Sequence, residues 1–245
     1  MQLKPDPVET AEKIYREKFP DAKAFFLAGS VLRNEATKFS DLDIIVVFDH
    51  LEVAYRESFI FDEWPVEVFV HDPATLNYFF QKVDGPTGVP SLASMVSEGA
   101  DISAPSDFSN KLKDTANTLL KDGPAHWSKA ELDRSRYFIT DFCDDLRSPR
   151  SFHEMVGTLG LLQEALTNFH FRSQSKWSAR GKTIPRRWKQ EDPALADEYL
   201  SAFECALKQG DTTKVIDFSE KLLKPFGGWL FEGFKMEAPK DWRLP

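Results

Sequence analysis

The stretch AFFLAGSVLRNEATKFSDLDIIVVF, residues 24–48, decides how the first part of this 245-residue chain folds. Its first five residues form an apolar run that ends at Gly29-Ser30, which is typical of a short buried strand. Residues 41–48 are rich in β-branched side chains and give the strongest strand signal in the chain. We expect a short helix from Ser30 to about Glu35 between these two strands, and a third strand over residues 66–71.

Carboxylates gather on these predicted strands. Asp41 and Asp43 point to the same face, because strand side chains alternate, and they lie roughly 7 Å apart along the chain. Two like charges on an apolar strand are costly unless a cation lies between them, and Mg²⁺ is the cation that prefers carboxylate oxygens. Glu67, inside the third strand, is expected either to complete a second metal site or to accept a proton from an attacking hydroxyl.

Gly29 and Ser30 complete the pattern. Glycine permits close approach of the backbone, and a helix beginning at Ser30 would offer free N–H groups and a hydroxyl to a phosphate. A phosphate cradle beside metal-binding carboxylates predicts phosphoryl or nucleotidyl transfer, in which catalysis consists mainly of positioning and charge neutralisation.

These residues resemble the signature of the DNA polymerase beta-like nucleotidyltransferases: an apolar strand, Gly-Ser, a spacer, an Asp-x-Asp pair and a later strand carboxylate. Arg33 and the stretch from Ser40 to Asp43 are similar to the antibiotic-modifying (aminoglycoside or kanamycin-type) branch, although Asn34 and Lys38 depart from it. The resemblance covers about the first hundred residues. It implies two Mg²⁺ ions on Asp41, Asp43 and Glu67, with ATP as co-substrate.

The resemblance also implies transfer of a nucleoside monophosphate, AMP being favoured, to a hydroxyl of a small-molecule acceptor such as an aminoglycoside-like compound, with release of pyrophosphate. Gly29 and Ser30 would seat the phosphates, with Arg33 as a further contact. Two alternatives stay open: a protein or RNA acceptor, as in toxin–antitoxin systems, and a catalytically silent nucleotide-binding regulatory protein. The acceptor, the nucleotide and the oligomeric state are not determined by the sequence.

A change of pattern at residues 104–109 (APSDFS) divides the chain. Residues 1–105 are expected to form a small mixed-sheet nucleotidyltransferase domain, and residues 106–245 an all-α helical bundle that binds substrate, so the fold class is α+β. Capping boxes at Ser128 and Ser151, each followed by an amphipathic run, support helices in the second part.

Charge separates the two parts as well. Residues 1–105 hold 18 acidic and 9 basic residues, and residues 106–245 hold 21 and 22. Nucleic-acid binding is therefore not expected, because it depends on basic side chains that neutralise phosphates. The basic run from Arg172 to Lys189 has three interpretations: a solvated loop, a nucleic-acid contact or a phosphate contact. As a phosphate contact, its Lys176 would reach a triphosphate across the cleft between domains.

The remaining features favour a cytoplasmic protein. The N-terminal sequence has no signal-peptide pattern, and the apolar runs are too short to span a membrane. Two cysteines, Cys143 and Cys205, are too few for a disulfide framework.

Overall fold

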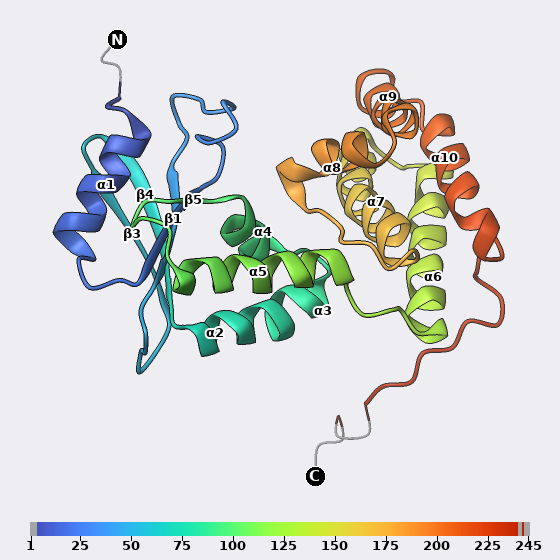
Figure 1. The fold of residues 1–245 in the computed structure, drawn as a ribbon. Helices are drawn as coiled ribbons and strands as arrows, with labels where there is room; N and C mark the ends of the chain where they lie inside the picture. The colour runs from blue at the N-terminus through green and yellow to red at the C-terminus, as the bar shows by residue number, and fades with distance from the viewer. Residues whose placement is uncertain (1–3, 240–241, 243–245) are drawn as a thin grey trace. The chain divides into compact units, whose positions relative to one another are not determined.

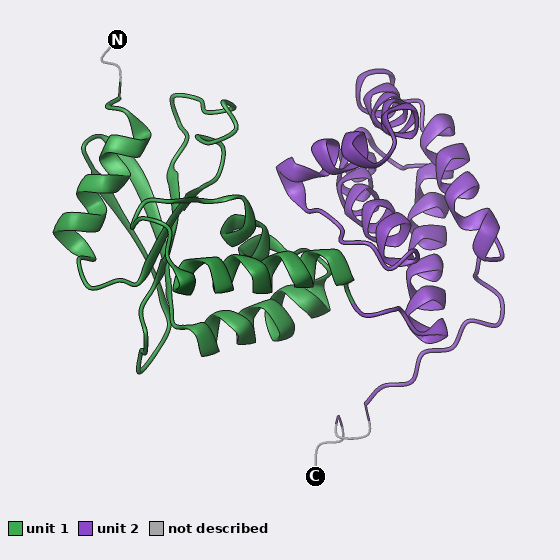
Figure 2. Cartoon of the chain, in the orientation of Figure 1, with its two compact units in different colours: residues 1–124 green, residues 125–245 purple. Residues whose placement is uncertain are grey.

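A computed structural model describes residues 4–239 and residue 242. The chain divides into two compact units, Met1–Pro124 and Ala125–Pro245 (Figure 2). The division falls after helix α5 (Asp107–Asp122), whereas the sequence pattern placed this helix at the start of the second domain. Leu112 and Ala116 of α5 are buried in the same apolar cluster as Phe26 of the sheet, which makes α5 part of the first core.

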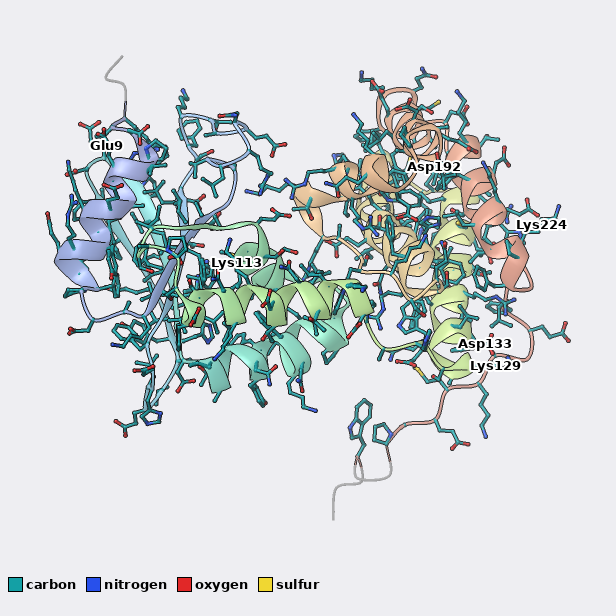
Figure 3. All side chains as sticks on the ribbon, in the orientation of Figure 1. Glu9, Lys113, Lys129, Asp133, Asp192 and Lys224 are labelled. Atoms are coloured by element: carbon teal, nitrogen blue, oxygen red, sulfur yellow. The ribbon has the colours of Figure 1, made fainter. Side chains whose placement is uncertain are left out.

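Lys113, labelled in Figure 3, fixes the same helix by a polar contact. Its Nζ donates to the carbonyl of Gly99 at 2.6 Å and lies 5.6 Å from the centroid of the Phe26 ring. The polar break at residues 104–109 therefore marks a loop inside the first unit rather than its end.

The first unit is built on a mixed five-stranded sheet in the order β3-β4-β2-β1-β5 (Figure 1). Strands β2 and β4 are parallel, and the other neighbours pair antiparallel. The strands are β1 (Ala24–Ala28), β2 (Leu42–Val47), β3 (Tyr55–Phe61), β4 (Trp64–His71) and β5 (Ala100–Asp101). This arrangement confirms the predicted fold class and all three strands that the sequence predicted.

Strand β3 was not predicted, because it lies at the edge of the sheet and most of its side chains are exposed. It forms a hairpin with β4 through a two-residue turn, Asp62-Glu63, in which both residues have positive φ angles of 44° and 68°. Such a turn matches the right-handed twist of the flanking strands and so fixes their register.

Alternation along β1 sends successive side chains into two apolar clusters, one on each face of the sheet. Phe25 and Leu27 pack with Ile14 of α1 (Pro7–Lys18), whose N-terminus is capped by Asp6. Phe26 packs on the other face, against Leu92 of α4 (Ser91–Glu98) and residues of α5. Helix α2 (Pro73–Tyr78) and a π-helix η1 (Phe79–Asp84) also contribute to this second face, through Leu76 and Phe80, and the short α3 (Gly85–Thr87) follows η1.

The second unit is all-α, as predicted. Trp188 and Tyr199 are fully buried at its centre with their rings stacked at 4.7 Å, and the Trp188 indole donates to Thr167 Oγ1 at 3.0 Å. The Ser128 capping box is present, and Ser151 accepts a hydrogen bond from the Glu154 amide. The helices are α6 (Lys129–Arg147), α7 (Phe152–Arg172), η2 (Gly181–Thr183), α8 (Ile184–Glu191), α9 (Pro193–Gln209), α10 (Thr213–Leu223) and η3 (Lys224–Phe226).

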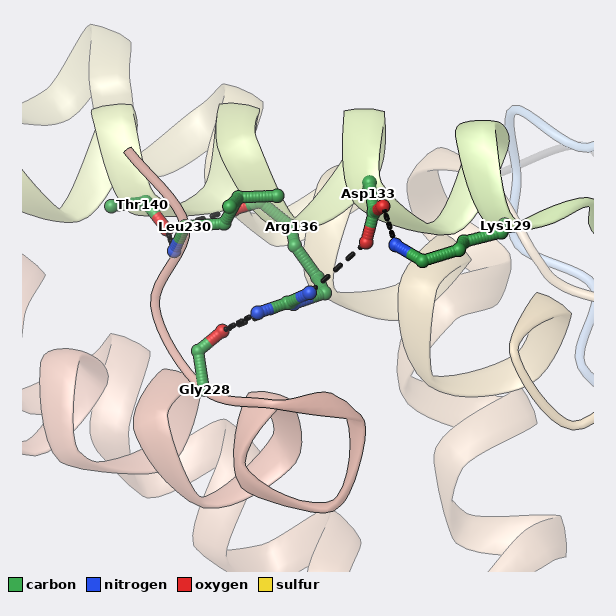
Figure 4. A network of polar contacts seen from close by, with 6 residues as sticks. All are labelled: Lys129, Asp133, Arg136, Thr140, Gly228 and Leu230. Carbon is green, nitrogen blue, oxygen red and sulfur yellow. Dashed lines mark hydrogen bonds and ion pairs between the residues drawn. The ribbon is translucent and has the colours of Figure 1, made fainter. Parts of the chain in front are cut away.

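The segment after η3 is tied back to α6 by a polar network (Figure 4). Arg136 is buried and donates from Nε and Nη2 to the Gly228 carbonyl, at 3.1 and 2.9 Å, and from Nη1 to Asp133 at 3.0 Å. Two residues further along the segment, the Leu230 amide donates to Thr140 Oγ1 at 3.0 Å. Arg136 anchors this segment, because its charged guanidinium is buried and donates to the Gly228 carbonyl.

Candidate active site

Strand register brings the three predicted carboxylates together. Asp43 on β2 lies directly beside Glu67 on the parallel strand β4, and Asp41 precedes β2 by one residue. One carboxylate oxygen from each of Asp41, Asp43 and Glu67 lies within 4.8 Å of the other two. All three residues are half-buried, so solvent reaches the cluster in part. Their catalytic and metal-binding roles stay predictions.

The absence of a side chain at Gly29 leaves space for the Asp43 carboxylate. Gly29 follows β1 with a φ of +84°, a conformation that L side chains rarely adopt. A Cβ at this position would overlap the Asp43 carboxylate, lying 3.1 Å from its Cγ. The backbone therefore approaches the carboxylate as closely as glycine alone allows.

The structure corrects the helix expected from Ser30 to Glu35. This segment is a set of turns, in which the amides of Arg33 and Glu35 both donate to the Ser30 carbonyl, at 3.2 and 3.1 Å. Asn34 has a φ of 56°, which a right-handed helix does not accept. Any phosphate contact here would come from turn amides and the Ser30 hydroxyl, not from a helix N-terminus.

Ser30 is also linked to the far end of the loop that leads to the carboxylates. Its Oγ lies 3.3 Å from Ser40 Oγ, which in turn accepts a hydrogen bond from the Thr37 amide at 2.8 Å. Since Ser40 immediately precedes Asp41, these bonds hold the Gly-Ser turn beside the first carboxylate.

Arg33 lies on the same turn and is engaged by acids. Its Nε is 3.0 Å from Glu35, and its Nη1 is 3.5 Å from Glu98 at the end of α4. These ion pairs connect the turn to the helix. The phosphate contact predicted for Arg33 would have to compete with both carboxylates.

Arg56 on β3 is a site residue that the sequence reasoning missed. It forms an ion pair with Glu67, and its Cζ lies 5.0 Å from the centroid of the Phe69 ring. No local signal marked it, because its position depends on the pairing of an edge strand that was itself not predicted.

Lys176 lies in the second unit and forms an ion pair with Glu191. Glu191 also pairs with Arg187 Nη2 at 3.3 Å, and Arg187 donates from Nε to the Trp177 carbonyl at 2.9 Å. Several members of the basic run are engaged within the second unit: Arg172 is buried, and the exposed Arg180 lies 3.6 Å from Glu164. The phosphate contact predicted for Lys176 stays a prediction.

Two histidines are held by packing. Burial lowers the pKa of His71, whose ring meets Phe79 edge-on at 4.9 Å. Burial also lowers the pKa of His170, to about 4, and its ring stacks on Trp188 at 4.5 Å. Both rings are therefore neutral near pH 7, and neither adds a charge to the units that hold them.

The donor set fits a divalent cation. Hard oxygen ligands from three carboxylates converge, and the glycine beside them leaves room for the Asp43 carboxylate. Among the described residues, this cluster is the one group of three or more acidic, histidine or cysteine side chains close enough to share a metal.

Residues 8–83 match the model of the nucleotidyltransferase domain. The match contains Gly29, Asp41, Asp43 and Glu67, so the first unit carries a nucleotidyltransferase domain and the carboxylate cluster lies within it. This domain supports nucleotidyl transfer as the general class of activity.

Among solved structures, the chain is similar to a nucleotidyltransferase-like protein from Exiguobacterium sibiricum 255-15, at 13% sequence identity and a TM-score of 0.44. The alignment covers 89% of this chain and 74% of that one, and the similarity is too distant to carry a functional argument. No curated protein matches the sequence. Across the described part of the chain, none of the helices has the length and apolar character that crossing a membrane requires.

Proposed function

We propose that this protein transfers a nucleoside monophosphate, AMP from ATP, to a hydroxyl of a small-molecule acceptor and releases pyrophosphate. The observation that carries the proposal is the convergence of Asp41, Asp43 and Glu67 oxygens within 4.8 Å, inside a nucleotidyltransferase domain and against the backbone of Gly29. Convergent carboxylates on an otherwise apolar sheet are expected where charge must be neutralised during reaction.

Asp41 and Asp43 would hold Mg²⁺, and Glu67 would either complete a second metal site or act as the base. Bound there, Mg²⁺ would neutralise phosphate charge and increase the acidity of a nearby hydroxyl. The Ser30 hydroxyl and the turn amides that follow Gly29 would bind phosphate oxygens. Arg33 would place a positive charge beside the triphosphate.

The reaction replaces a phosphoanhydride bond of the triphosphate by a phosphoester bond to the acceptor. The acceptor oxygen forms a bond to the α-phosphorus, and the bond from that phosphorus to the bridging oxygen breaks. Pyrophosphate leaves with the electron pair. Where Glu67 acts as the base, the hydroxyl proton passes to one of its carboxylate oxygens. Glu67 suits this role because its side chain is partly exposed, which gives an acceptor access to it.

The acceptor is proposed from charge. The acidic excess of residues 1–105 favours a cationic, polyhydroxylated molecule such as an aminoglycoside. The resemblance of Arg33 and residues 40–43 to the antibiotic-modifying branch supports the same class.

The test is pyrophosphate release from each nucleoside triphosphate with Mg²⁺, across panels of aminoglycosides, proteins and tRNA. Asp43→Asn should lower turnover by about 10²-fold or more. Asp49→Asn is the matched control. Asp49 is exposed beyond the end of β2, and its substitution changes the net charge by the same amount as Asp43→Asn.

Each outcome separates one alternative. Equal turnover by wild type and Asp43→Asn would refute the site. Labelling confined to protein or tRNA would replace the small-molecule acceptor. Nucleotide binding without turnover on any panel would identify a silent regulatory protein.

A further inference from the structure

Arg56 is placed against the carboxylate cluster by strand pairing. In the antiparallel hairpin of β3 and β4, Arg56 lies opposite Phe69, two residue pairs along from Ser58–Glu67 and therefore on the same face of the sheet. Its guanidinium forms an ion pair with Glu67 Oε1 while its Cζ stays 5.0 Å from the Phe69 ring centroid. Two contacts to the same strand therefore define its position.

The ion pair is not explained by stability. The Arg56 side chain is 57% exposed, and exposed ion pairs contribute little to folding because solvent screens them and both side chains lose freedom. Glu67, its partner, is nevertheless one of the three carboxylates that converge on a single point. The main effect of Arg56 is therefore on the electrostatic potential where the three carboxylates converge.

We propose that Arg56 is a built-in counterion of the carboxylate cluster, which holds Glu67 in place and limits how tightly the cluster takes a divalent cation when no nucleotide is bound. The proposal rests on the proposed metal site. Arg56 offsets one of the negative charges that the three carboxylates carry when ionised. A cation that approaches Glu67 is repelled by Arg56 and must share the carboxylate with it.

Removal of the Arg56 charge should therefore strengthen cation binding. Coulomb's law for charges of +1 and +2 separated by about 6 Å in a water-like medium gives an effect on the order of tenfold in affinity. Damage to the fold would act in the opposite direction, because a loosened cluster binds a cation less tightly. The sign of the change thus distinguishes a counterion from a structural residue.

The experiment measures binding of Mn²⁺ alone, without nucleotide, from the free-Mn²⁺ electron paramagnetic resonance signal at about 0.01 M salt, where the Debye length of about 30 Å leaves the interaction nearly unscreened. Arg56→Gln should bind Mn²⁺ about tenfold more tightly than wild type. Arg56→Lys, which keeps the charge, should stay within about threefold. Arg16→Gln is the matched control for net charge, because Arg16 lies on α1 of the same unit and its side chain is 65% exposed; its affinity should equal that of wild type.

Asp43→Asn separates the two proposals. If Mn²⁺ binds and Asp43→Asn abolishes that binding, but Arg56→Gln binds equally or less tightly than wild type, the counterion role is overturned while the metal site stands. Equal gains in Arg56→Gln and Arg16→Gln would also overturn it, since net charge would then be the cause. If wild type binds no Mn²⁺, or if Asp43→Asn binds Mn²⁺ as tightly as wild type does, the metal site is refuted. The counterion role is then refuted as well.

Discussion

Replacing Gly29 by alanine tests the closest contact in the candidate site. The substitution adds one methyl group at a backbone φ of +84°, directly against the Asp43 carboxylate. The new Cβ would lie 3.1 Å from Asp43 Cγ and 3.2 Å from Asp43 Cβ, closer than such atoms ordinarily approach. Asp43 would have to rotate out of the cluster or β1 would have to move away from β2.

The cost has two parts. The left-handed backbone conformation disfavours alanine by about 1–2 kcal/mol, and overpacking against Asp43 adds about 1–3 kcal/mol. Gly210 provides a control for the first part alone, because its φ is +73° and a Cβ there would meet nothing within 4 Å. Gly29→Ala should therefore be destabilised more than Gly210→Ala, and it alone should disturb the carboxylates.

Turnover and Mn²⁺ affinity are the assays, with circular dichroism to confirm that both variants fold. We expect Gly29→Ala to lose about 10²-fold in turnover, because one carboxylate is displaced, and Gly210→Ala to match wild type. Wild-type turnover and Mn²⁺ affinity in a folded Gly29→Ala protein would refute the reasoning, since the carboxylate would then tolerate the methyl group.

Two further predictions concern stability. Burial raises the pKa of Asp84 from 3.8 to about 6, so the folded protein binds its proton more readily than the unfolded chain does. The free energy of unfolding of wild type relative to Asp84→Asn should thus be highest below pH 4 and fall by up to about 3 kcal/mol as the pH rises to 6. Denaturant titration at each pH measures this difference, and a difference that is constant with pH would contradict the prediction. Arg136→Met should leave the Gly228 carbonyl unpaired and cost about 1.5–3 kcal/mol, which should speed chymotrypsin cleavage at Phe231 relative to the exposed control Arg134→Met. Equal cleavage of the two variants would show that Arg136 does not anchor the segment.

Local pattern was sufficient for the apolar part of the first unit. Strands β1, β2 and β4 are recognisable because their burial on the sheet faces requires apolar residues. Where the pattern was polar, local reasoning failed. Strand β3 has mostly exposed side chains, and its existence depends on backbone pairing with β4, which leaves no periodic signal.

The spacer and the domain boundary show the same limit. Residues 30–35 have a composition that a helix accepts, but turn bonds to the Ser30 carbonyl and the positive φ of Asn34 give a different path. The Pro- and Ser-containing segment before α5 suggested a boundary, yet Leu112 and Ala116 bury against the first core. The path of residues 30–35 and the packing of α5 both depend on contacts beyond the neighbouring residues in sequence.

The sequence alone identified the candidate residues for the chemistry. Asp41, Asp43 and Glu67 could be placed on common strand faces from side-chain parity, because that alternation is a local property of an extended backbone. Only the tertiary structure decided what surrounds them: the parallel register that sets Asp43 beside Glu67, the overlap that reserves position 29 for glycine, and the edge strand that brings Arg56 to Glu67. These features arise between segments distant along the chain, where hydrogen-bond pairing and packing, rather than local composition, determine which side chains meet.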